Sequence, residues 1–261
     1  MGNCFEIRIG DESACIETAD ELVAVLDVLQ GHHDKEVLQQ LSPDLHSIIR
    51  NSRELLKIVA VLPNEDQIFL FKILGDHLSG IIGNGAGLRD LLAYISASEV
   101  EEALIEMLKP EGIQKLIIHV VELAEVLEWV YGCRDRMIID YLGADSFQNM
   151  VENGRDLSLV MRSLEPDFQK QLLNELGIDY LNRIIRQKDD FSSLLKALPF
   201  ETSKKLMDSM SHEKLKGLVR SSADLAYISK FLDQKETDYL KLKLEGIEHA
   251  SCTHFGLAQE P

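Results

Sequence analysis

Residues 156–185 read DLSLVMRSLEPDFQKQLLNELGIDYLNRII, and this stretch carries the apolar pattern that decides the fold. Its first block begins at Leu157 and repeats apolar residues four and seven positions later, on one face of a short helix. Pro166 marks a turn, and a second block ends at Gly177, a residue typical of the position just past a helix C-terminus. A third block closes on a pair of isoleucines. The stretch therefore predicts short helices separated by turns.

The same pattern occurs seven times, at intervals of 33 to 35 residues. The copies begin at the anchors Leu22, Leu55, Leu88, Leu123, Leu157, Phe191 and Leu225. A fixed period of this size means that each copy buries its apolar face against its neighbours. Helices this short are marginal in isolation, so their stability must come from stacking. The sequence predicts an all-α fold, a right-handed α-solenoid of about seven 33–35-residue repeats, each of two to three short helices.

The repeats divide the chain into three parts. Residues 1–19 form an N-terminal extension, residues 20–244 form the helical repeat domain, and residues 245–261 form a tail that we expect to be mobile. No linker rich in glycine, serine or proline interrupts the repeats, so the sequence favours one elongated domain.

Composition excludes several classes of protein. The chain has 44 aspartate and glutamate residues against 27 lysine and arginine residues, a net charge of −17 that disfavours nucleic acid as a partner. The longest apolar stretch is interrupted by charges, so no membrane span is expected, and no secretory signal is recognisable. The four cysteines are widely spaced, which predicts reduced thiols and a cytoplasmic location. They are Cys4, Cys15, Cys133 and Cys252.

The residue before each anchor is acidic in six of the seven copies. These positions hold Glu21, Glu54, Gly87, Glu122, Asp156, Asp190 and Asp224. An acid in the first turn of a helix opposes the macrodipole and accepts from free N–H groups. This structural interpretation is favoured over a row of ligand-binding carboxylates.

The position after the paired apolar residues of the third block holds Gly83 and Glu152 in two copies and basic residues in three. The basic residues are Arg50, Arg186 and Arg220, with Arg183 and Lys188 close to one of them. Equivalent positions in stacked helices lie about 8–10 Å apart, so we expect Arg186 and Arg220 to be neighbours. The five residues either complement the dipoles of their helices or form a contact strip for an acidic partner.

Other candidate sites are weaker. The glycines of Gly80–Gly87 lack the preceding strand and the following lysine of a phosphate loop, which predicts a turn between two copies. His249, Cys252 and His254 offer three metal ligands in a tail that lacks a fourth. Trp129, beside Val130, is interpreted as a core residue. No catalytic constellation is recognisable, and the sequence predicts no catalytic residue, metal, cofactor or small-molecule ligand.

Two resemblances bear on function. The period is similar to that of tetratricopeptide repeats, without their signature residues. The repeated leucine-rich pattern of residues 20–244 resembles the leucine-rich helical repeats of translocated effector proteins of intracellular bacterial pathogens. The tail from Glu245 to Pro261, with upstream glutamates and an apolar residue near its end, resembles a type IV secretion signal. These resemblances imply a protein that is translocated into a host cell or acts on another effector.

The leading hypothesis is a non-enzymatic protein–protein interaction module, a scaffold, adaptor or regulator whose partner is another protein. The first alternative is an enzyme whose site lies in the solenoid groove. The second is nucleic-acid binding along the edge that carries Arg50, Arg186 and Arg220.

Overall fold

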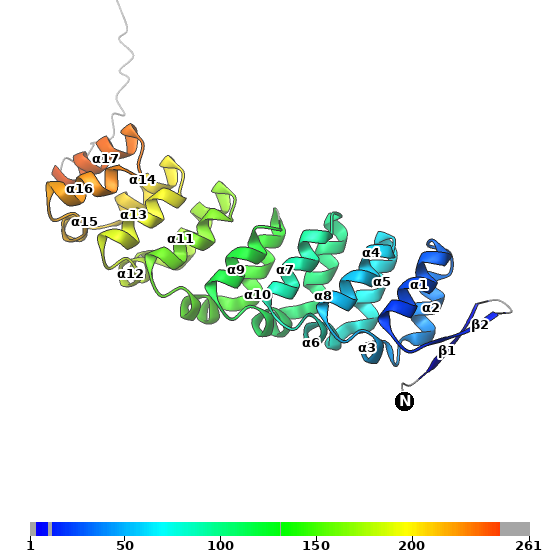
Figure 1. The fold of residues 1–261 in the computed structure, drawn as a ribbon. Helices are drawn as coiled ribbons and strands as arrows, with labels where there is room; N and C mark the ends of the chain where they lie inside the picture. Colours follow the sequence, from blue (N-terminus) through cyan, green and yellow to red (C-terminus); the bar gives the residue numbers. More distant parts are fainter. Residues whose placement is uncertain (1–3, 10–11, 131, 246–261) are drawn as a thin grey trace, which may run out of the picture. The chain divides into compact units, whose positions relative to one another are not determined.

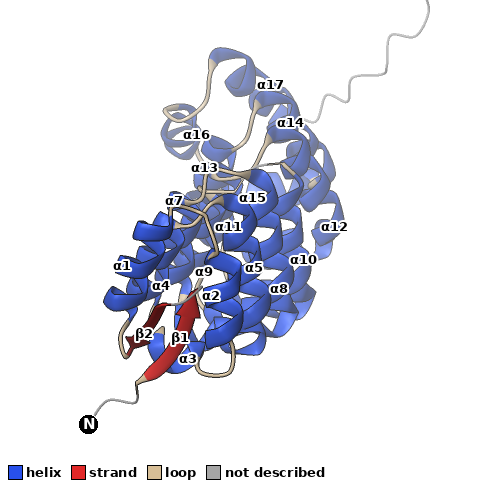
Figure 2. Ribbon diagram, turned by 90° about the vertical axis from the view of Figure 1, so that its right-hand side faces the viewer, coloured by secondary structure: helices blue, strands red, loops and turns tan. Residues whose placement is uncertain are grey.

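The computed structural model describes residues 4–9, 12–130 and 132–245. These residues are mostly helical, which confirms the all-α class (Figure 2). In this part of the chain the strands form one antiparallel hairpin, β1 (Phe5–Ile9) and β2 (Glu12–Ile16), with Ile7 opposite Ala14. The sequence pattern predicts only an N-terminal extension here, without a hairpin. The predictions for residues 246–261 lie outside the described residues.

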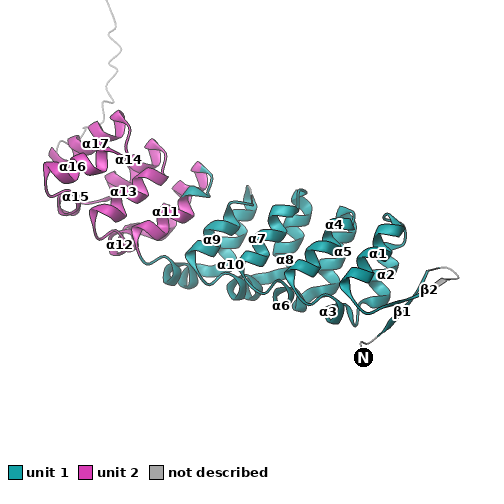
Figure 3. Cartoon of the chain, viewed as in Figure 1, with its two compact units in different colours: residues 1–152, 162–165 teal, residues 153–161, 166–261 magenta. Residues whose placement is uncertain are grey.

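The chain divides into two compact units, whereas the sequence favours one repeat domain over residues 20–244 (Figure 3). Unit 1 comprises residues 1–152 and 162–165, and unit 2 comprises residues 153–161 and 166–261. Charge is unequally divided between them. Unit 1 has 28 acidic against 12 basic residues, a net charge of −16, whereas unit 2 has 16 against 15, a net charge of −1.

Unit 1 packs the helices of successive copies side by side (Figure 1). Its helices are α1 (Ala19–Leu29), α2 (Asp34–Leu41), α3 (Leu45–Ile48), α4 (Ser52–Val61), α5 (Asn64–Leu74), the 3₁₀ turn η1 (Gly75–His77), α6 (Leu78–Ile82), α7 (Gly85–Tyr94), α8 (Ser98–Leu116), α9 (Val120–Leu127) and α10 (Cys133–Met150). The first helices pack in the order α1, α4, α7, α9, and the second helices in the order α2, α5, α8, α10. The hairpin packs through β1 on α2 and through β2 on α1.

Unit 2 has the same kind of packing. Its helices are α11 (Gly154–Arg162, of which the last residue belongs to unit 1), α12 (Pro166–Ile184), α13 (Lys188–Ala197), α14 (Phe200–Ser209), α15 (His212–Leu218), α16 (Ser222–Ser229) and α17 (Gln234–Glu245). Helix α13 packs against α16, and α14 contacts both α12 and α17.

The predicted anchors form the core. Six of the seven are fully buried: Leu22, Leu55, Leu88, Leu123, Leu157 and Phe191. Leu225, in the last copy, is only partly buried. The burial of the anchors at a period of about 34 residues explains why each short helix is stable only beside its neighbours.

In four copies the second and third blocks meet at a residue with positive φ. Gly75 (φ 45°) separates α5 from η1, and Gly143 (φ 74°) and Gly177 (φ 73°) interrupt α10 and α12, as the sequence predicts. Helix α8 has Lys109 (φ 57°, ψ 173°) at the equivalent position. Pro110 follows, and a proline disfavours the α conformation of the residue before it.

Two cysteines differ from the sequence prediction. Cys4 and Cys15 form a disulfide within the N-terminal hairpin, with their Cα atoms 5.5 Å apart, so the prediction of reduced thiols is wrong for this pair. Cys133 is a free, exposed thiol.

Within the described ranges, no helix is both long and apolar enough to cross a membrane.

Candidate functional site

The acidic residues before the anchors hold the N-termini of the first helices. Glu21 Oε2 accepts from the backbone N–H groups of Glu17 at 2.7 Å and Thr18 at 3.1 Å. Asp190 Oδ2 accepts in the same way from Arg186 at 3.0 Å and Gln187 at 3.2 Å. The hydrogen bond from Glu17 lowers the pKa of Glu21. The structural interpretation of these acids is therefore supported over a row of ligand-binding carboxylates.

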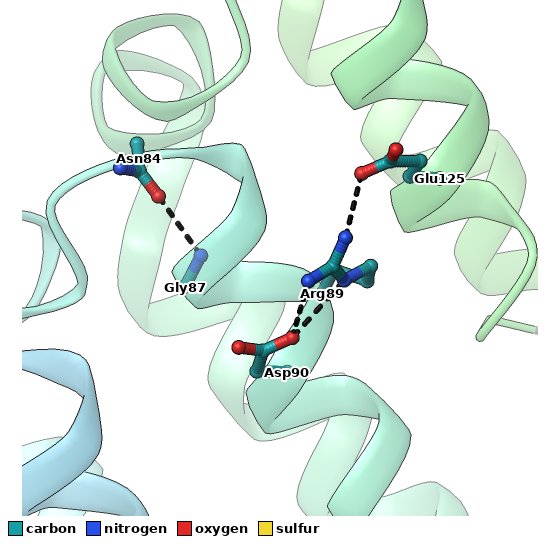
Figure 4. A network of polar contacts seen from close by, with 5 residues as sticks. All are labelled: Asn84, Gly87, Arg89, Asp90 and Glu125. Carbon is teal, nitrogen blue, oxygen red and sulfur yellow. Dashed lines mark hydrogen bonds and ion pairs between the residues drawn. The ribbon is translucent and has the colours of Figure 1, made fainter.

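Gly87 replaces the acid in the third copy for a steric reason. A Cβ atom on Gly87 would lie 2.3 Å from the carbonyl oxygen of Ile82. The helix is capped instead by Asn84, whose Oδ1 accepts from the Gly87 N–H at 2.9 Å (Figure 4). Gly83 has a φ of 83° and ends α6. The glycine-rich stretch is a turn between two copies, as predicted, and it follows a helix rather than a strand.

Arg89 links two copies beside this turn. Its Nη1 lies 2.8 Å from Glu125 Oε2 on α9, and its Nη2 lies 2.7 Å from Asp90 Oδ1 on α7 (Figure 4). The hydrogen bond to Asp90 raises the pKa of the Arg89 guanidinium. Both partners of Arg89 come from unit 1, so its charge is compensated within the stack.

Three of the five predicted contact residues line one cleft in unit 2. The cleft has a volume of about 490 Å³. Its lining residues are Arg186, Gln187, Lys188, Asp189, Gly217, Leu218, Arg220 and Asp224. They come from the start of α13, the end of α15 and the start of α16. The expected proximity of Arg186 and Arg220 is thus found in the structure.

The helix ends fix the arginines of the cleft. Arg186 Nε donates to the carbonyl oxygen of Arg183 at 2.8 Å, and Arg220 Nε donates to that of Gly217 at 2.9 Å. In both cases the acceptor lies three residues earlier, at the end of a helix that has unpaired carbonyl groups. Within the described residues, neither guanidinium forms an ion pair with a carboxylate. Each side chain is held through its Nε atom, and both residues are exposed.

The acids of the cleft already have partners. Lys188 Nζ lies 2.6 Å from Asp224 Oδ1 and 5.4 Å from the centre of the Tyr227 ring. This hydrogen bond raises the pKa of Lys188 and lowers that of Asp224, so both groups are charged at neutral pH. Asp189 Oδ2 pairs with Arg155 Nη2 at 2.7 Å. The two arginines therefore supply the uncompensated positive charge of the cleft.

The other two predicted residues lie elsewhere. Arg183 is not part of the cleft lining, and its guanidinium carbon lies 4.9 Å from the centre of the Tyr180 ring. Arg50 belongs to unit 1, where its Nε donates to the carbonyl oxygen of Ser47 at 2.8 Å. Arg50 thus makes the same helix-capping hydrogen bond as Arg186 and Arg220, but it does not belong to the cleft lining.

A row of buried polar residues was not recognised in the sequence. These residues follow the anchors by 12 positions, or by 13 in the third copy, and all are buried: Asp34, Gln67, Glu101, Asp135, Gln169, Ser203 and Thr237. Gln67 Nε2 donates to the carbonyl oxygens of Val59 and Leu62, both at 2.9 Å, which ties the second helix of a copy to the end of its first. The sequence signal for this row was a polar residue at nearly the same distance from the anchor in every copy.

The acids in this row are unusual. The side chain of Asp34 is buried; burial first, and then the charge of Asp66, raise its pKa, whereas a hydrogen bond from the Gly31 backbone lowers it. Glu101 Oε2 lies 2.6 Å from Arg134 Nε, and burial raises the pKa of Glu101 despite this ion pair. The described residues contain no group of three side chains that could hold a metal ion. The row is therefore interpreted as structural.

Trp129 is exposed, so its interpretation as a core residue is wrong. It follows the end of α9, and 42% of its surface is accessible. Its neighbour Val130 is buried instead.

Comparisons with models of protein families, with curated proteins and with solved structures find no match for this chain.

Proposed function

We propose that the protein is a non-enzymatic interaction module, built as a right-handed α-solenoid of about seven repeats, whose partner is another protein. The packing of equivalent helices within each unit, and the burial of the anchors at a constant period, support the solenoid. Solenoids of this kind present extended surfaces, and such surfaces commonly bind other proteins.

The cleft formed by Arg186, Lys188 and Arg220 is the observation that supports this function. Among the described residues its two guanidinium groups have no carboxylate partner, because Asp224 pairs with Lys188 and Asp189 pairs with Arg155. Guanidinium groups bind carboxylates through two parallel hydrogen bonds, and such pairs are about twice as strong as neutral ones. We therefore infer that the cleft binds an acidic segment of the partner.

A binding experiment with a labelled hexaglutamate peptide tests this proposal. Because Arg220→Gln removes one of the two free guanidinium groups, we expect it to weaken binding about tenfold in a fluorescence anisotropy titration. Arg50→Gln is the matched control, because Arg50 has the same helix-capping hydrogen bond but lies outside the cleft. Equal affinities of the two variants for the peptide would exclude the cleft as its binding site.

The resemblance to translocated effectors supports a further proposal, that the protein acts in a cytoplasm, either of the cell that makes it or of a host cell. The segment that resembles a secretion signal lies almost wholly outside the described residues.

A further inference from the structure

The sixth residue after each anchor is apolar in the first four copies. These residues are Val28, Val61, Tyr94 and Trp129, which we call the apolar row. Val28 is 81% exposed, Tyr94 is 48% exposed and Trp129 is 42% exposed, while Val61 is partly buried. Scattered exposed apolar residues need no explanation, but three exposed members of this row recur at one position of copies whose first helices pack in sequence.

The members of the apolar row lie on adjacent helices of unit 1. Val28, Val61 and Tyr94 come from the ends of α1, α4 and α7, and Trp129 follows the end of α9; these four helices pack in that order. Tyr94 Oη donates to the carbonyl oxygen of Ala60 at 3.4 Å, which places the ring against the preceding copy. Ala60 and Ala93 are also exposed beside the row. Because packed helices lie about 8–10 Å apart, the row offers apolar contacts at about that spacing.

The row ends in an apolar cleft of about 300 Å³ where the hairpin meets α1. Besides Val28, this cleft is lined mainly by Ile9, Ala14, Ala24, Val25 and Leu29. A pocket of this size admits one large apolar side chain of a partner. Tyrosine and tryptophan are enriched among the residues that dominate binding energies, so the other end of the row also suits an interface.

Acidic side chains flank the apolar row. Asp27 and Glu128 directly precede its first and last members and are exposed. Two cations on α4 and α7 form ion pairs with acidic side chains. Lys57 pairs with Asp20 at 2.5 Å, and Arg89 pairs with Asp90 and Glu125. The whole of unit 1 has a net charge of −16. This field attracts a cationic partner and repels an anionic lipid surface.

We propose that the apolar row binds a basic segment of a partner protein, with apolar side chains spaced about 10 Å apart. The segment places one apolar side chain in the cleft beside Val28 and another against Tyr94 and Trp129. Its lysine or arginine residues lie over the acidic flanks. This surface is chemically opposite to the basic cleft of unit 2, so the protein has two sites of different specificity.

Selection from a random peptide display library tests this proposal. The bait is the full chain carrying Arg186→Gln and Arg220→Gln, so that the basic cleft does not retain acidic peptides. We expect selected peptides to be enriched in lysine or arginine together with leucine, isoleucine or phenylalanine. Enrichment of acidic peptides, or of none, would overturn the proposal.

A selected peptide that contains no tryptophan is then titrated into the protein. Trp129, the sole tryptophan of the protein, is the fluorescent probe. We expect a saturable blue shift of its emission, and a roughly tenfold loss of affinity in Tyr94→Ala. Ile118→Ala is the matched control, because Ile118 is 58% exposed but lies outside the row, and its affinity should equal that of the parent. An equal loss in both variants, or an equal blue shift with phosphatidylcholine vesicles, would contradict binding of a basic peptide at the row.

Discussion

The row of buried polar residues shows how one position serves different purposes in successive copies. In the second copy Gln67 satisfies two carbonyl groups, whereas in the first copy the position holds Asp34, a buried carboxyl whose pKa is raised by its burial. Burial of a charged carboxylate is costly. The offset of this row was visible in the sequence, but its burial was not, because polar residues are usually exposed.

The raised pKa of Asp34 leads to a prediction about stability and pH. Since folding disfavours the charged carboxylate, Asp34 contributes stability below its unfolded pKa, and this contribution is lost as pH rises through the folded pKa. Nearby charges are Asp66, which raises the pKa further, and His32, which lowers it. We therefore expect Asp34→Asn to raise the free energy of unfolding at pH 7 by on the order of 1 kcal/mol.

Denaturant unfolding between pH 3 and pH 7 measures this effect. The advantage of Asp34→Asn should shrink as pH falls and the native carboxyl becomes protonated. Asp44→Asn, at an exposed carboxyl in the same unit, should show no such pH-dependent gain. A pH-independent difference between Asp34→Asn and the parent would refute the assignment to this carboxyl.

At the scale of elements, the sequence predicts the blocks of each copy and the glycines between them. It does not identify Lys109, because a lysine gives no signal of positive φ and Pro110 shows only that the helix is interrupted. It also misses the hairpin, although Phe5, Ile7 and Ile9 alternate with polar residues before a Gly-Asp pair. The helical period of the remaining chain dominated the interpretation of this short segment.

Lys109 has a backbone conformation that strongly favours glycine. We expect Lys109→Gly to stabilise the protein by about 1 kcal/mol, because relief of strain exceeds the added entropy of the unfolded chain. The substitution removes an ion pair between Lys109 and Asp76, but both side chains are mostly exposed, so this loss is small.

Thermal unfolding of two variants measures the backbone effect. Gly177→Ala is the reciprocal change and should destabilise the protein by about 1 kcal/mol. No atom lies within 4 Å of the added Cβ, so its cost reflects the positive φ of 73° rather than a clash. Destabilisation by Lys109→Gly would show that Lys109 is not strained.

At the scale of the molecule, the division of charge separates the two candidate surfaces. Of the net charge of −17, unit 1 carries −16 and unit 2 carries −1. The sequence predicts the proximity of Arg186 and Arg220, because the repeat places equivalent residues on adjacent helices. It does not predict the apolar row, because the exposure of Trp129 depends on where α9 ends.

The central claim, that the cleft of unit 2 binds an acidic segment, is tested most directly by nuclear magnetic resonance. The ¹⁵N-labelled chain is titrated with hexaglutamate while its backbone amide resonances are followed. We expect saturable shifts for residues 186–189 and 217–224, with no shift at Arg50. Shifts of equal size at Arg50, or none at the cleft, would contradict it.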